Sequence, residues 1–248
     1  MHGRNRAYME ASEMPKNVAE KIMVAEQVLE VRYVPVGSFL DVRGYVADFI
    51  RESGFLPHWK IDTDVVNFRD KPDMSAKEGA FAGYRTAGYF AYDPETRNFF
   101  VDRGGAFWRL LQKNQHYAIP ALQRFGARTK VFLPSAKSFE EINRAVYQVL
   151  YSEKVRGIVG GAEKDCQFII ESMDEGFDGR TAGGPIHNKE GRNYFSFDAK
   201  HFESAGFFLD VDFYRTKDVK HEEVPKLLRA AVDLTWKKIE SFAAAIGV

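Results

Sequence analysis

The chain has 248 residues, and its 35 Lys and Arg side chains balance 35 Asp and Glu, so the formal net charge is zero. This balance argues against non-specific binding to nucleic acid or to an anionic membrane, because both depend on excess positive charge. The single cysteine, Cys166, excludes an intrachain disulfide and a thiolate cluster for zinc.

The N-terminal segment, residues 1–25, is polar, and we expect it to be partly disordered. It lacks the apolar stretch of a secretory signal. No apolar run in the chain reaches the roughly 18 residues that cross a membrane. These features predict a cytoplasmic protein with no membrane partner.

A first unit over residues 26–125 opens with a predicted strand at 28–34, where charged and apolar residues alternate. Ser38 and Asp41 then match the S-x-x-[DE] pattern of a capping box, which predicts a helix that ends near Gly54. The rest of the unit is predicted to contain extended segments at 65–69, 81–92 and 98–103, a turn at 93–96 and a helix at 107–122.

A second unit over residues 126–248 repeats this order. A predicted strand at 127–133 precedes Ser138 and Glu141, which again match a capping box. The helix that they begin carries its apolar stripe one hundred residues after the stripe of the first helix. The remaining predicted elements are strands at 165–173, 193–199 and 206–214 and a long helix at 222–246.

Two similarities within the sequence indicate an internal duplication. Residues 38–41 return at 138–141, and residues 95–100 return at 190–195. Because no linker rich in Gly, Pro or Ser separates the units, we expect them to share one core. The predicted fold is α+β, with two β-α-β-β-(β)-α units, a mostly antiparallel sheet, helices on one face and a long C-terminal helix.

The order of these elements resembles a prokaryotic family of about this length that is described only as sporadically distributed. The resemblance covers most of the chain after Met14. It rests on the strand at 29–34, the segment at 107–122, Arg124-Phe125-Gly126-Ala127-Arg128 leading into a strand, and Phe208-Leu209-Asp210-Val211-Asp212 before the terminal helix. The resemblance implies an α+β protein of uncharacterised role and transfers no catalytic residue.

The first candidate site is the sheet face turned away from the helices. Alternation along a strand places Asp210 and Asp212 on one face, together with Phe208 and Tyr214. If the neighbouring strands contribute Arg32, Arg128 and Lys130, a charged face results, edged by the aromatic residues Tyr33, Phe132, Phe208 and Tyr214. Three interpretations remain open: a solvated ladder of cross-strand ion pairs, which we favour, a surface for a ligand or partner, and a catalytic site.

A second candidate is the Gly-rich stretch 174–187, which contains Arg180. Glycine lets the backbone approach a ligand, and free amides beside Arg180 could hold an anion. The stretch lacks the spacing of a P-loop or a dinucleotide-binding motif. We therefore favour a flexible hairpin loop. The shorter Gly-rich segment at 157–163 is predicted to be a turn, and Cys166 a small buried apolar residue.

No catalytic, metal-binding or cofactor motif stands out in the sequence. We predict a non-catalytic binding or adaptor protein that uses the duplicated sheet face to contact a partner protein or a second copy of itself. The alternative is an enzyme or sensor for a small polar ligand, with a composite site at the seam between the repeats.

Overall fold

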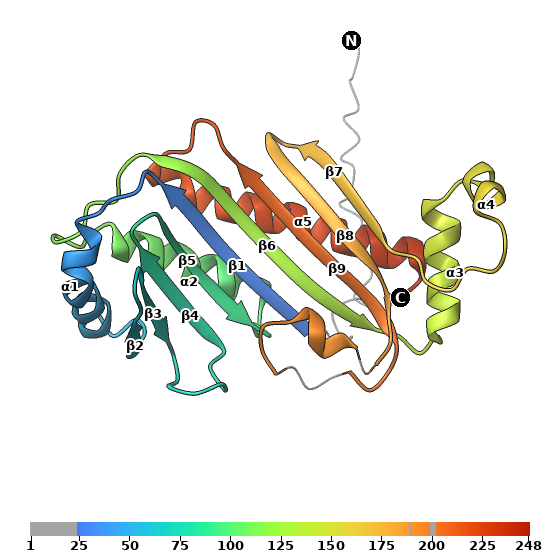
Figure 1. Cartoon of the computed structure of the whole chain (residues 1–248), viewed down its shortest axis with the longest axis horizontal. Coiled ribbons are helices and arrows are strands. Elements are labelled where there is room, and N and C mark those ends of the chain that lie inside the picture. Colours follow the sequence, from blue (N-terminus) through green and yellow to red (C-terminus); the bar gives the residue numbers. More distant parts are fainter. Residues whose placement is uncertain (1–23, 189, 199–201) are drawn as a thin grey trace, which may run out of the picture.

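The computed structural model describes residues 24–188, 190–198 and 202–248, so most of the segment 1–25 lies outside the described residues. Its centre is a nine-stranded antiparallel sheet with the order β2-β3-β4-β5-β1-β6-β9-β8-β7 (Figure 1). The strands are β1 (Val24–Tyr33), β2 (His58–Ile61), β3 (Val65–Arg69), β4 (Glu78–Gly83), β5 (Thr86–Tyr92), β6 (Leu122–Pro134), β7 (Phe168–Asp174), β8 (Phe177–Ile186) and β9 (Gly206–Arg215). The helices are α1 (Phe39–Glu52), α2 (Arg97–Leu111), α3 (Phe139–Leu150), α4 (Glu153–Val159) and α5 (Val224–Ile246), with short 3-10 turns η2 (Gly191–Tyr194) and η3 (His221–Glu223).

The two halves of the chain follow the same path, so the α+β fold is internally repeated. β1 and β6 lie side by side at the centre of the sheet. Each leads into a helix at one end of the molecule, then into strands that return towards the centre, and finally into a long helix, α2 or α5. The short strand β2 and the helix α4 have no counterpart in the other half.

The register between β1 and β6 shows which residues of the two repeats correspond. Val28 lies opposite Arg128, which follows it by one hundred residues. On either side of this pair, Glu26 lies opposite Lys130 and Glu30 opposite Gly126. A pseudo-twofold axis therefore passes between Val28 and Arg128.

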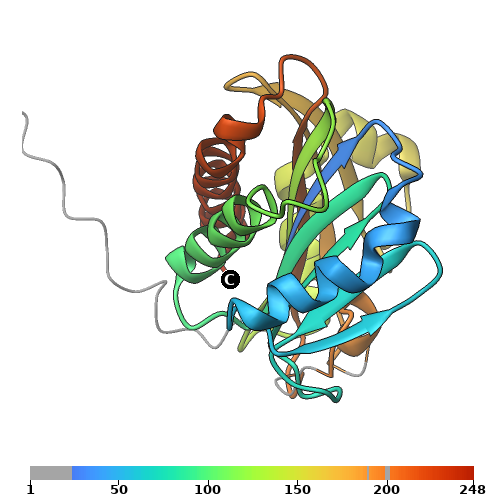
Figure 2. The ribbon, with the colours of Figure 1, turned by 90° about the vertical axis from the view of Figure 1, so that its left-hand side faces the viewer.

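One face of the sheet is covered and the other is largely open. α2 and α5 lie together on the same side of the sheet (Figure 2). Their buried side chains, such as Phe107 and Leu228, join one apolar core that contains strand residues from both repeats. A smaller apolar cluster covers one end of the opposite face; it consists of Val24, Phe132, Ile186, Phe195, Phe202 and Phe208. The rest of this opposite face is called the open face below.

The two predicted capping boxes differ. Ser138 accepts a hydrogen bond from the backbone N–H of Glu141, whose carboxylate accepts one from the N–H of Ser138, so this box is complete. Ser38 makes no side-chain cap, because the chain already turns helically before it and its own carbonyl accepts from the N–H of Asp41. The prediction was wrong for Ser38 although α1 begins at Phe39.

Residues 98–103 form the first part of α2 and not a strand. The run Phe99-Phe100-Val101 is rich in residues that favour strands, but Thr96 caps a helix by accepting from the N–H of Phe99. α2 ends at Leu111, so the helix expected at 107–122 covers only its C-terminal part. Tertiary burial of one helical face decides the outcome here.

The similarity of 95–100 to 190–195 is not part of the repeat. The first segment leads into α2 after β5, whereas the second contains η2 and precedes β9. The strand expected at 193–199 is therefore absent from residues 193–198, the part of it that the structure describes.

The Gly-rich stretch 174–187 is mostly the strand β8 and not a flexible loop. Only Glu175 and Gly176 form its turn, with positive φ angles of 47° and 78°. Within β8, a Cβ on Gly179 would lie 2.8 Å from the ring of Phe213. Glycine therefore serves close packing here. The turn predicted at 157–163 was wrong for residues 157–159, which belong to the unforeseen helix α4; Gly160 and Gly161, with positive φ angles, follow the end of that helix.

Candidate functional site: the charged seam of the open face

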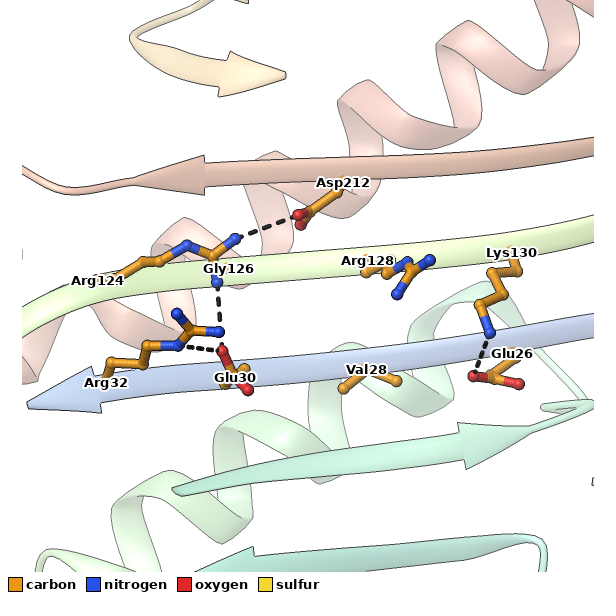
Figure 3. A pocket seen from close by; sticks show the side chains of 9 residues that line it. All are labelled: Glu26, Val28, Glu30, Arg32, Arg124, Gly126, Arg128, Lys130 and Asp212. Atoms are coloured by element: carbon orange, nitrogen blue, oxygen red, sulfur yellow. Dashed lines mark hydrogen bonds and ion pairs between the residues drawn. The ribbon is translucent and has the colours of Figure 1, made fainter. Parts of the chain in front are cut away.

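A hollow of about 200 Å³ lies on the open face at the seam between the repeats (Figure 3). Seven of the nine residues that line it are charged. The lining consists of Glu26, Val28, Glu30, Arg32, Arg124, Gly126, Arg128, Lys130 and Asp212. Because these residues come from β1, β6 and β9, the hollow needs both repeats.

Gly126 forms the floor of the hollow. A Cβ at this position would lie 2.7 Å from Nη1 of Arg124, so the absence of a side chain lets the guanidinium lie across the sheet. The same guanidinium lies 4.8 Å from the ring centroid of Tyr214, within the range of a cation–π contact. Tyr214 therefore helps to hold Arg124 in place.

Arg124 connects the two repeats. It donates to Oε1 of Glu30 on β1 at 3.4 Å and to Oδ2 of Asp212 on β9 at 3.2 Å, and Figure 3 shows it between these two carboxylates. Arg32 donates to the same oxygen of Glu30 at 2.6 Å. Burial raises the pKa of the Asp212 carboxyl above its ordinary value, and the nearby guanidinium groups of Arg124 and Arg128 only partly oppose this.

Glu26 is a charged group that is almost completely buried, with 4% of its surface exposed. Its carboxylate accepts from Nζ of Lys130 at 3.1 Å and from the backbone N–H and the hydroxyl of Ser196 at 2.6 and 3.0 Å. These bonds tie the segment between β8 and β9 to one end of the seam. The three donors compensate for the desolvation of the carboxylate.

Asp210 is the second buried carboxylate of the face, with 7% exposure. Arg128 binds it with two parallel hydrogen bonds of 2.7 and 2.6 Å. Arg180 lies further away, at 3.9 Å from the nearer oxygen. The planar fork of Arg128 thus holds Asp210 in one orientation.

The structure places all seven candidate residues on the open face or at its rim. Those that line the seam hollow are Arg32, Arg128, Lys130 and Asp212. Asp210 and Arg180 border a neighbouring hollow, and Tyr214 supports Arg124. Tyr33 was wrongly expected at this face: it is buried on the helix side, where its hydroxyl donates to the carbonyl of Gly83.

Sequence reasoning missed Glu26 and Arg124. The strand was taken to begin at Val28, although the alternation that places Glu30 on the open face extends back to Glu26. Arg124 has the same parity as Arg128 in β6 and could have been found in this way.

The arrangement supplies fixed charges and no nucleophile. Cys166 lies outside the seam lining, is buried as predicted, and burial raises the pKa of its thiol. Within the residues that the structure describes, no three His, Cys, Asp or Glu side chains are placed to hold a metal ion. No helix in that part of the chain is long and apolar enough to cross a membrane.

Comparison with known proteins adds no identity to this geometry. No protein-family model matches the chain, and no curated protein matches it significantly. The resemblance to the sporadically distributed prokaryotic family therefore stays a prediction.

Proposed function

We propose that this chain is a non-catalytic binding protein and that the seam hollow is its binding site for a small polar ligand. The observation that carries the proposal is the lining itself, in which four cationic and three anionic side chains from both repeats surround one hollow. A ligand that carries both charges matches this lining better than a simple anion or cation does.

The burial of the charges supports binding over a merely solvated ladder of ion pairs. Exposed ion pairs cost little to form and stabilise little. Glu26 and Asp210 are desolvated, which costs several kcal/mol per ion before pairing offsets it. In return, the charges are held in fixed positions, and fixed charges lose little entropy when a ligand binds.

The raised pKa of Asp212 favours a second candidate, an enzyme that moves a proton at the same hollow. The hollow offers no nucleophile beside this carboxyl, and Arg124 already occupies it. We therefore rank the binding function first.

Native mass spectrometry of the purified chain and calorimetric titration with L-arginine and L-glutamate test the proposal. We expect a retained small molecule, or heat of binding for at least one amino acid, in the wild type. Arg124→Gln should abolish it. Arg69→Gln, which removes one exposed positive charge from β3 outside the lining, should leave it unchanged.

The proposal is overturned if the wild type shows neither a retained molecule nor heat. It is also overturned if Arg124→Gln binds as the wild type does. Thermal unfolding followed by circular dichroism confirms that each variant is folded.

A further inference from the structure

A second hollow, of about 340 Å³, lies beside the seam on the open face. It shares Arg128 and Lys130 with the seam hollow and extends across β8 towards the edge strand β7. Its floor is formed in part by Ala182 and Gly184, which contribute little or no side chain.

The pseudo-twofold axis identifies the corresponding positions in the first repeat. Val28 lies opposite Phe90, and Arg128 lies opposite Asp212, so Phe90 corresponds to Asp212. One strand further out, Phe90 lies opposite Gly79 and Asp212 opposite Arg180. Gly79 therefore corresponds to Arg180.

The same register shows that a residue lining the second hollow corresponds to a phenylalanine of the first repeat. Gly88 lies opposite Phe81, and Asp210 lies opposite Ala182, so Phe81 corresponds to Ala182. Phe81 and Ala182 lie two residues after Gly79 and Arg180 in their strands, so all four positions belong to the same face of the sheet.

In the first repeat, aromatic rings fill the space over the glycines. The ring of Phe90 comes within 2.3 Å of where a Cβ on Gly79 would lie, and the ring of Phe81 within 2.5 Å of the Cβ position of Gly88. Such ring-over-glycine contacts stabilise a sheet face. In the second repeat, Ala182 stands at the position of Phe81 and Asp210 at the position of Gly88, so no ring covers this part of the face, and Ala182 lines the second hollow.

The polar end of this hollow favours an anion. Asp210 is already held by Arg128, and the nearest oxygen of Asp210 lies 3.9 Å from Arg180, beyond hydrogen-bond range. Among the described residues no hydrogen bond occupies the guanidinium of Arg180, and 40% of its side chain is exposed. Arg180 is ion-paired with Asp210 only at this longer distance, so its N–H groups can donate to a ligand carboxylate, which an arginine fork binds with two hydrogen bonds.

The opposite part of the hollow is apolar. The rings of Tyr194 and Phe208 lie 4.6 Å apart between centroids and line it. Ile169 on β7 also lines it and is 64% exposed, which is high for a large apolar side chain. Apolar surface of this kind is stabilised when a ligand covers it.

We propose that this second hollow binds a small organic carboxylate that carries an aromatic ring. The carboxylate pairs with Arg180, and the ring lies over Ala182 against Tyr194 and Phe208. The inference extends the proposed binding function to a second, adjacent site of different chemistry.

Calorimetric titration with 2-naphthoate tests the inference, with the uncharged 2-naphthamide as the matched ligand. We expect 2-naphthoate to bind and the amide to bind about tenfold more weakly, because it lacks the charge that pairs with Arg180. Arg180→Gln should weaken 2-naphthoate by a similar factor. Ala182→Phe should abolish its binding by placing a ring in the hollow, whereas Arg69→Gln should have no effect.

Equal binding of acid and amide, or unchanged affinity in Ala182→Phe, overturns the inference. If Ala182→Phe does not fold, the affinity of Arg180→Gln for 2-naphthoate and the affinity of the wild type for 2-naphthamide still test the inference. Arg124→Gln separates the two sites, because Arg124 lines the seam hollow only. Loss of amino-acid binding in that variant with 2-naphthoate binding intact supports both proposals. A wild type that retains no small molecule and binds neither amino acid overturns the seam site alone.

Discussion

Replacing Glu26 by Gln tests whether the seam charges are truly buried. The substitution keeps the shape of the side chain but removes the charge that accepts from Lys130 and Ser196. Lys130 is then left as an uncompensated cation, and its side chain is largely buried. Breaking a buried ion pair from one side costs about 3–5 kcal/mol. Because Gln retains one acceptor for Ser196, we expect a loss of about 3 kcal/mol.

Urea unfolding followed by circular dichroism measures this loss. We expect the slope of the unfolding free energy against urea concentration to be the same in variant and wild type. Glu30→Gln is the matched control: Glu30 lies on the same strand, but 30% of its side chain is exposed, so we expect about 1 kcal/mol or less. The double variant Glu26→Gln/Lys130→Met should recover most of the loss, because it removes the unpaired cation. Hydrogen exchange at the Ser196 amide should be faster in Glu26→Gln than in the wild type.

A loss below about 1 kcal/mol for Glu26→Gln would refute the reasoning, because that is the range of exposed pairs. A double variant less stable than the single one would also refute it, since the unpaired cation would then not be the source of the loss.

Two further changes test the caps and the carboxyl with a raised pKa. Ser138→Ala should cost about 1 kcal/mol of unfolding free energy, whereas Ser38→Ala should cost a few tenths, because only Ser138 caps its helix; equal losses in chemical denaturation would contradict this. Burial raises the pKa of Asp212, so its contribution to stability is greatest below the unfolded pKa and falls as the pH rises through the folded one. Asp212→Asn should therefore gain stability relative to the wild type from about pH 4 upward, and a difference independent of pH in thermal melts would argue against it.

Alternation predicted the faces of the sheet wherever the two faces meet different surroundings. In β9, Leu209 and Val211 point into the core while Asp210 and Asp212 lie on the open face, so the two-residue period is visible in the sequence. β8 carries no such signal. A Cβ on Gly179 would meet the ring of Phe213, and a Cβ on Gly183 would meet the carbonyl of Phe208. Both neighbours lie in β9, so the sequence of β8 alone does not reveal why glycine is needed.

The contacts of the site depend on partners that lie far apart in the chain. Arg128 and Asp210 could be assigned to one face from local patterns, but their pairing depends on β6 and β9 being neighbours. Glu26 is bound by Ser196, which follows it by 170 residues and lies shortly after the 3-10 turn η2, outside any strand. No local pattern indicates such a contact.

The pair Val28 and Arg128 at the pseudo-twofold axis has a consequence for symmetry. A dimer of two identical half-length chains would place the same residue on both sides of its axis, as every symmetric dimer does. Joining both halves in one polypeptide removes that restriction, so valine can face arginine across the axis. A molecule that lies across the axis meets unlike groups at its two ends and is held in one direction, where a symmetric dimer would accept it in either.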